Sequence, residues 1–102
     1  MKIPSKFKFL GLEFKVKLVS IIDQSNLNIV GRTDMNNQII LIKKGMPKQA
    51  IELTFLHELT HVLFSQMGID KALKMDSEAE EVVVNAFSNG LYGLIANGTI
   101  KC

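Results

Sequence analysis

The sequence predicts an α+β fold, in which a small antiparallel N-terminal sheet is followed by two helices. Three observations support this prediction: apolar and polar residues alternate early in the chain, Gly- and Asn-containing segments interrupt these runs, and two long segments with helix-capping signals follow. The chain has 102 residues, of which 47% are hydrophobic, so we expect a single domain, residues 1–102, with one core.

The first sheet segment spans residues 7–19, which are rich in Phe and Val. Their alternation predicts one or two strands with one buried face, and Gly11 marks a turn or bulge between them. The early lysines alternate with the apolar residues, so we expect them on the solvent face of the sheet rather than in a basic binding stripe; they are Lys2, Lys6, Lys8, Lys15 and Lys17.

A second sheet segment is predicted around the tripeptide Met35-Asn36-Asn37, which is flanked by residues 28–34 and 38–42. Asparagine tolerates the left-handed backbone of a tight hairpin, so these residues are expected to form the turn. The continuous apolar run from Ile39 to Ile42 predicts a strand that is covered on both faces.

Two helices are predicted in the second half of the chain. The first runs from about Pro47 to Met67, with proline in its first turn and Gly68 as its left-handed cap. A polar linker, residues 69–75, leads to a second helix that ends near Ile95. Asp76 or Ser77 can cap this helix. Three glutamates lie in its first turns, where the positive end of the helix dipole favours negative charge; they are Glu78, Glu80 and Glu81.

Charge and composition argue against several classes of function. Twelve basic and ten acidic side chains give a net charge of +2, which does not indicate nucleic acid or a membrane as the main partner. The single cysteine, Cys102, allows neither an intrachain disulfide nor a cysteine-rich zinc site. We find no secretion signal and no membrane-spanning run, so a cytoplasmic protein is expected.

The two histidines of the chain, His57 and His61, stand four positions apart, and Glu58 directly follows the first. On a helix this HExxH spacing places both imidazoles on one face, where they can share a zinc ion. Glu58 then has the position of a general base, which takes a proton from the attacking water and passes it to the leaving amine.

A catalytic zinc site usually needs a third protein ligand, and no histidine remains to provide it. Glu78, Glu80 and Glu81 compete for this role, and we favour Glu81, which follows His61 by 20 positions (81 − 61). Asn85 lies one turn further along the same face of an otherwise apolar helix, so we expect its amide to hydrogen-bond a ligand histidine.

Tyr92 lies eleven residues beyond Glu81 (92 − 81), about 16 Å along a helix, which is too far for it to act at the same metal. We therefore interpret Tyr92 as a packing residue, and the group that stabilises the oxyanion is not assigned.

The spacing from His61 to Glu81 resembles that of zincin peptidases with a glutamate as third ligand. The stretch from Glu81 to Ser88 is similar to the ExxANxFA segment of the ImmA/IrrE group, and the short chain resembles small metallopeptidases predicted in phages and mobile elements. The resemblance implies a minimal zincin-like domain with zinc on His57, His61 and Glu81 and with Glu58 as base.

Two functions follow from these features. The first is a zinc metallopeptidase that acts on a protein or peptide, with residues 38–42 as the strand edge along which an extended substrate lies. The alternative is a non-catalytic zincin-fold binding module, with structural or absent zinc, that captures a partner such as a repressor. The oligomeric state is not predicted.

Overall fold

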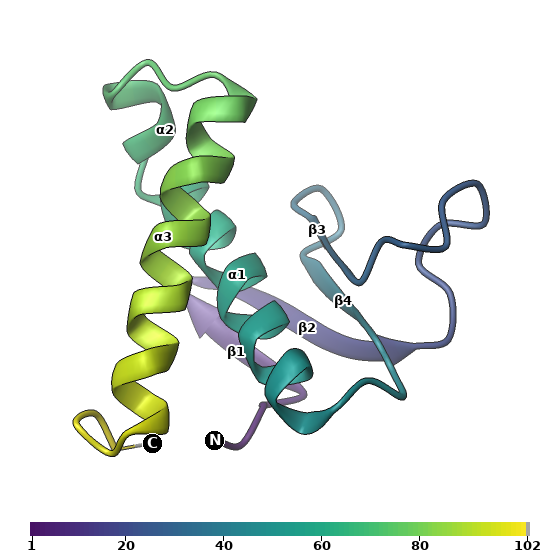
Figure 1. Cartoon of the computed structure of the whole chain (residues 1–102). Helices are drawn as coiled ribbons and strands as arrows, with labels where there is room; N and C mark the ends of the chain where they lie inside the picture. The colour runs from purple at the N-terminus through teal and green to yellow at the C-terminus, as the bar shows by residue number, and fades with distance from the viewer. Residues whose placement is uncertain (102) are drawn as a thin grey trace.

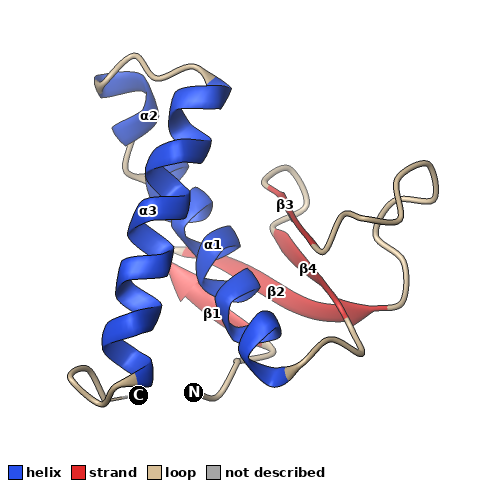
Figure 2. Cartoon of the chain, viewed as in Figure 1, coloured by secondary structure: helices blue, strands red, loops and turns tan. Residues whose placement is uncertain are grey.

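A four-stranded sheet forms one side of the structure, a computed structural model that describes residues 1–101 (Figures 1 and 2). Cys102 lies outside the described residues. The strands follow the order β1-β2-β4-β3 across the sheet. Their bounds are β1 Lys6–Phe9, β2 Leu12–Val19, β3 Gly31–Asp34 and β4 Ile39–Lys43.

The first two strands form the predicted hairpin. Leu10 and Gly11 make its turn with positive φ angles of 51° and 82°, a conformation that suits the twist of paired strands. Phe7 lies opposite Phe14, and their rings stack with centroids 5.3 Å apart. The lysines on these strands are exposed, as the alternation predicts.

The sheet is mixed, whereas the sequence analysis predicts a wholly antiparallel one. Strand β2 pairs in parallel with β4, and only the β1/β2 and β3/β4 pairs are antiparallel. After β2, residues 20–30 lead to β3, which lies two strand positions away from β2. Strand β4 then fills the position between β2 and β3. This order gives the most apolar strand, β4, hydrogen-bonded neighbours on both sides.

Strand β4 is therefore central, and the predicted substrate edge at residues 38–42 is wrong. The free edge on this side of the sheet belongs to β3, which is shorter than the predicted segment 28–34. The prediction that β4 is covered on both faces is also wrong in part. Ile40 and Ile42 are fully buried beneath the helices, but Ile39 and Leu41 on the other face are only half-buried.

The β3–β4 turn has a different left-handed residue from the one predicted. Gln38, not an asparagine, has the positive φ angle of 56°. Asn37 instead donates from its backbone N–H and its side-chain amide to the Asp34 carboxylate, at 3.1 and 2.8 Å. These bonds, the side-chain one above all, lower the pKa of Asp34.

The two long helices lie where the capping signals place them. Helix α1, Lys48–Gln66, begins after Pro47, and Gly68 adopts the left-handed conformation at its end with φ 70°. Helix α3, Ser77–Ala96, is capped by Asp76, whose carboxylate accepts the Ala79 N–H at 2.7 Å. The predicted linker contains an additional helical turn, α2, Ile69–Ala72.

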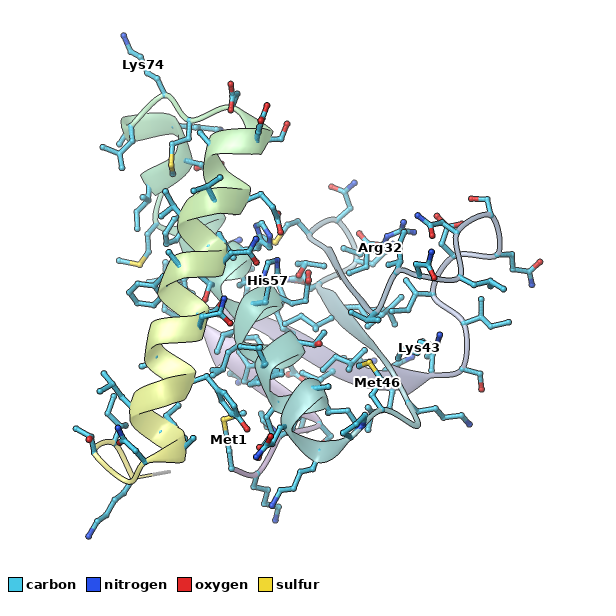
Figure 3. The ribbon with its side chains drawn as sticks, in the orientation of Figure 1. Met1, Arg32, Lys43, Met46, His57 and Lys74 are labelled. Carbon is cyan, nitrogen blue, oxygen red and sulfur yellow. The ribbon has the colours of Figure 1, made fainter. Side chains whose placement is uncertain are left out.

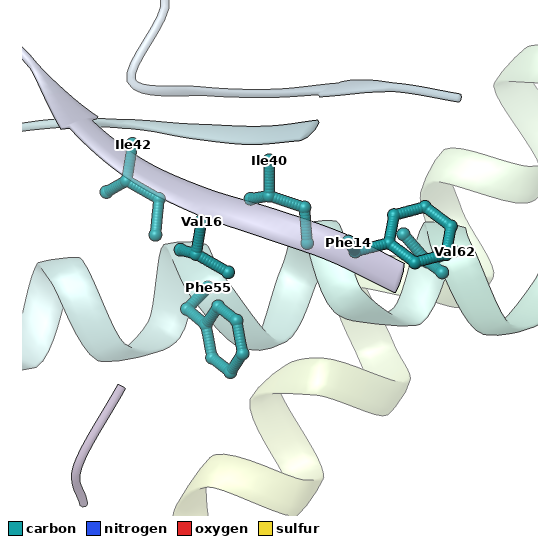
Figure 4. Close-up of a cluster of buried hydrophobic side chains, with 6 residues drawn as sticks. All are labelled: Phe14, Val16, Ile40, Ile42, Phe55 and Val62. Carbon is teal, nitrogen blue, oxygen red and sulfur yellow. The ribbon is translucent and has the colours of Figure 1, made fainter. Parts of the chain in front are cut away.

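Helix α1 lies between the sheet and α3 (Figure 1). On the sheet side it contributes Phe55 and Val62 to the core, which is completed by Phe14, Val16, Ile40 and Ile42 (Figure 4). Helix α3 lies outside this core and fully buries only Val84 and Ser88. Within residues 1–101, no helix combines the length and apolar character that a membrane span requires.

Candidate metal centre

The two histidines project from neighbouring turns of α1 with their ring centroids 5.0 Å apart. Their side chains are about one-fifth exposed, so they remain accessible from solvent. Figure 3 shows His57 in the space between α3 and the strands. The helical spacing thus has the predicted result, because both imidazoles reach the same side of α1.

Glu81 on α3 faces both imidazoles. One carboxylate oxygen lies 2.7 Å from His57 Nε2 and the other lies 3.1 Å from His61 Nε2. The three residues offer one ligand atom each within 4.8 Å of one another. In a tetrahedral zinc site with bonds of about 2.0–2.1 Å, ligand atoms lie about 3.3 Å apart, so this group has the size and the nitrogen and oxygen donors that zinc requires.

The other two glutamates that compete for the metal lie differently. Glu80 contacts the opposite side of the second imidazole, with its Oε2 2.8 Å from His61 Nδ1. Glu78 is exposed at the start of α3 and belongs to neither contact. Of the three glutamates, Glu81 is thus the one that the fold brings into the His57 and His61 group.

Glu58 is nearly buried, with 8% of its surface exposed, and it lines the same cleft as the histidines. Thr33 on β3 donates its hydroxyl to Glu58 Oε1 at 2.8 Å, and the same hydroxyl lies 3.3 Å from the Glu58 carbonyl oxygen. The short edge strand therefore fixes the carboxylate that follows the first histidine.

Gly31 allows β3 to approach α1 this closely. A Cβ atom at this position would lie 2.5 Å from Thr54 Cγ2 and 3.1 Å from Glu58 Oε2. A larger residue would clash with the Thr54 methyl group and press on the Glu58 side chain, so the strand or these side chains would have to shift.

A cleft of about 850 Å³ surrounds the histidines and is walled by α1, α3 and the segment from Ile29 to Thr33. Its volume is within the range of small-molecule and peptide sites. Besides the histidines, the polar wall of the cleft includes the guanidinium of Arg32 and several acidic and amide groups, which are Glu58, Asp70, Glu80, Glu81, Asn85 and Asn89.

Asn85 differs from the expectation for it. Its residue is exposed rather than buried, it lines the cleft, and the carboxylate beside His61 belongs to Glu80. The reason is the direction of α3, which turns Val84 rather than Asn85 toward α1. The premise of a buried amide at residue 85 was therefore wrong.

Tyr92 does not line the cleft. Its hydroxyl donates to Glu52 Oε1 at 2.8 Å, and the Met1 α-ammonium lies 2.9 Å from Glu52 Oε2. The hydrogen bond from the α-ammonium, followed by that from Tyr92, lowers the pKa of Glu52, and the bond to Glu52 raises the pKa of Tyr92.

Three residues of the site escaped the sequence analysis as contributors in these roles. Gly31 and Thr33 reach Glu58 only because the chain order places β3 at the sheet edge beside α1, and local spacing carries no signal for this. The sequence suggests Glu80 only as a competing metal ligand and not as a partner of His61 Nδ1. Its position next to Glu81 was the one sequence feature that could have indicated two carboxylates around one imidazole.

Comparisons with protein-family models, with curated proteins and with solved structures found no match to this chain. The resemblance to zincin peptidases therefore stays a prediction from the motif. The fold itself brings together three donors that could hold a metal ion, His57, His61 and Glu81.

Proposed function

We propose that the protein is a zinc-dependent metallopeptidase that hydrolyses peptide bonds of a protein substrate in this cleft. The observation that carries the proposal is the convergence of His57, His61 and Glu81 from two helices, with Glu58 in the same cleft. Two imidazoles and one carboxylate form a donor set of the kind found at catalytic zinc, which leaves a further position for water.

The chemistry of the donors fits zinc better than a harder cation. Calcium and magnesium prefer sites made of oxygen, whereas this group offers two nitrogens and one carboxylate. When bound, zinc supplies a Lewis acid that lowers the pKa of water to about 7 and polarises the scissile carbonyl. We also propose, as the sequence predicts, that the protein is cytoplasmic.

Glu58 is the proposed general base. Its carboxylate accepts a proton from the attacking water and returns it to the nitrogen of the leaving amine, so no net proton is retained. The Thr33 hydroxyl, at 2.8 Å, holds the carboxylate while the proton moves. Burial of Glu58 between β3 and α1 limits its access to bulk water.

An extended substrate has a backbone partner in β3. This strand pairs with β4 on one side, and its other side is the sheet edge next to the cleft. A peptide that adds to the edge gains main-chain hydrogen bonds with little dependence on its sequence. We propose this edge in place of residues 38–42.

The test is cleavage of a mixed peptide library, read by mass spectrometry, with zinc-loaded protein. We expect Glu58→Gln to lower the cleavage rate by about 10²–10⁴-fold, the usual contribution of a general base. Zinc binding should be retained, and Glu13→Gln, an exposed change on β2, should leave cleavage unchanged. Equal cleavage by Glu58→Gln and wild type would refute the role of Glu58.

The alternative, a non-catalytic binding module, uses the same fold without proton transfer. It is favoured by the outward face of α3, where Val82, Val83, Phe87 and Leu94 are 41–65% exposed and available to a protein partner. Absence of cleavage by the zinc-loaded wild-type protein, together with a partner that Glu58→Gln still captures, would support this alternative.

A further inference from the structure

Glu80 and Glu81 are consecutive residues that address the two nitrogens of one imidazole. Glu81 Oε2 lies 3.1 Å from His61 Nε2, and Glu80 Oε2 lies 2.8 Å from His61 Nδ1. The ring is therefore held between two carboxylates of the same helix. Of these, only Glu81 also contacts His57, at 2.7 Å.

We propose that Glu80 is a positioning residue for the metal site, and this inference rests on the proposed function. An Nδ1–H that donates to Glu80 leaves the lone pair on Nε2, the nitrogen that faces Glu81. Glu80 thus selects the His61 tautomer that can bind a cation shared with Glu81. It also makes the imidazole a better donor, because the carboxylate draws on the N–H proton.

The surroundings of Glu80 suit this role. About one-fifth of its side chain is exposed, compared with about half for Glu81, so its hydrogen bond is partly shielded from water. It lies in the first turns of α3, behind the Asp76 cap, where the helix end favours a negative charge. The Glu80 carboxylate therefore lies where the Nδ1–H of His61 requires an acceptor.

This arrangement differs from the one predicted from the sequence, in which the Asn85 amide, one turn after Glu81, hydrogen-bonds a ligand histidine. Asn85 is exposed, and the group beside His61 Nδ1 is the carboxylate of Glu80, which precedes Glu81 by one residue. The helix start thus provides what the Asn85 position lacks.

The experiment measures zinc affinity by competition with a chelating dye, for wild type, Glu80→Ala and the matched control Glu78→Gln. Loss of an outer hydrogen-bond partner of a metal ligand typically weakens affinity by 10–100-fold. We expect a loss of about this size for Glu80→Ala and less than about twofold for Glu78→Gln, whose side chain is exposed on the same turn. Circular dichroism checks that Glu80→Ala is folded.

A second readout reports on the tautomer itself. In nitrogen NMR of the zinc-loaded protein, we expect the His61 proton on Nδ1, with slow exchange in wild type and fast exchange in Glu80→Ala. A merely structural role of Glu80 would not move this signal. Zinc bound through His61 Nδ1, or equal affinity of Glu80→Ala and Glu78→Gln, would overturn the inference.

The outcomes separate this inference from the function on which it rests. If wild type binds no zinc, both fail. If wild type and Glu78→Gln bind zinc equally and Glu80→Ala does so as well, only the role of Glu80 fails.

Discussion

Two polar clusters join α1 to α3, and they differ in how their charges are balanced. In the first, which we call the closed cluster, Glu52 meets the Met1 α-ammonium and the Tyr92 hydroxyl. In the second, which we call the open cluster, His57 and His61 meet Glu80 and Glu81. The ion-pair side chains of the closed cluster are buried, with 7–8% of their surface exposed, whereas the side chains of the open cluster are 19–48% exposed.

The two clusters differ in whether the chain itself provides the partners of their carboxylates. The carboxylate of the closed cluster is satisfied by a cation and a hydroxyl of the chain itself, so it has a structural role. The open cluster brings carboxylate and imidazole donors together beside the cleft, and one set of them, His57, His61 and Glu81, is compatible with a metal ion.

We expect the two clusters to contribute to the docking of α3, because few of the residues of this helix are fully buried. Only Val84 and Ser88 are fully buried among its 20 residues, and they lie between the two clusters along the helix. We therefore expect a cation bound at the open cluster to stabilise the packing of α3 on α1, in addition to its proposed role in peptide hydrolysis.

The largest expected effect is stabilisation by zinc. A ligand that binds only the folded state at 100 times its Kd adds about 2.7 kcal/mol to the free energy of unfolding. We expect zinc to raise the Tm of wild type and of Tyr92→Phe by the same amount, although Tyr92→Phe starts from a lower Tm. His57→Ala should lose the rise, as measured by thermal denaturation with and without zinc.

The claim that only the open cluster binds zinc would be contradicted if zinc raised the Tm of His57→Ala as much as that of wild type. It would also be contradicted if Tyr92→Phe abolished the zinc effect, because the closed cluster would then take part in metal binding.

The sequence predicts the parts of the molecule that depend on local signals. The caps at Gly68 and Asp76 and the turn at Gly11 are confirmed because each follows from the conformational preference of one residue. The joint position of His57 and His61 follows from helical geometry alone. Glu81, the residue favoured as third ligand, lies beside both histidines, whereas the sequence alone did not separate it from Glu78.

The remaining features depend on contacts between distant segments. The parallel pairing of β2 with β4 is set by the path of residues 20–30, which has no local signature. The same path decides that Gly31 and Thr33, rather than β4, lie beside Glu58. The exposure of Asn85 depends on how α3 is rotated about its axis against α1. Apolar residues occur on several sides of this helix, and some of them are exposed, so the sequence does not show which side faces α1.

A smaller effect is expected from acid at the closed cluster. Because the folded-state pKa of Glu52 is lowered from its ordinary value of 4.5, its contribution to stability is complete above pH 4.5. It is lost as the pH falls through the lower folded-state pKa. The difference in unfolding free energy between wild type and Glu52→Gln should therefore be largest near pH 7 and shrink below pH 4.5.

Denaturant unfolding across this pH range measures that difference. A matched control is Glu13→Gln, which changes the same charge at an exposed position on β2 and should give a small difference at every pH. If the difference for Glu52→Gln stayed constant into acid, the ionised Glu52 would not be the source of stability in the closed cluster.

The central claim is that His57, His61 and Glu81 hold one zinc ion, and X-ray absorption of the purified, zinc-reconstituted protein tests it most directly. We predict one zinc per chain, with two imidazole nitrogens and carboxylate oxygen at about 2.0–2.2 Å, and a loss of this signature in His61→Ala. Zinc that is substoichiometric after reconstitution, or whose spectrum lacks imidazole or is unchanged in His61→Ala, would contradict the account.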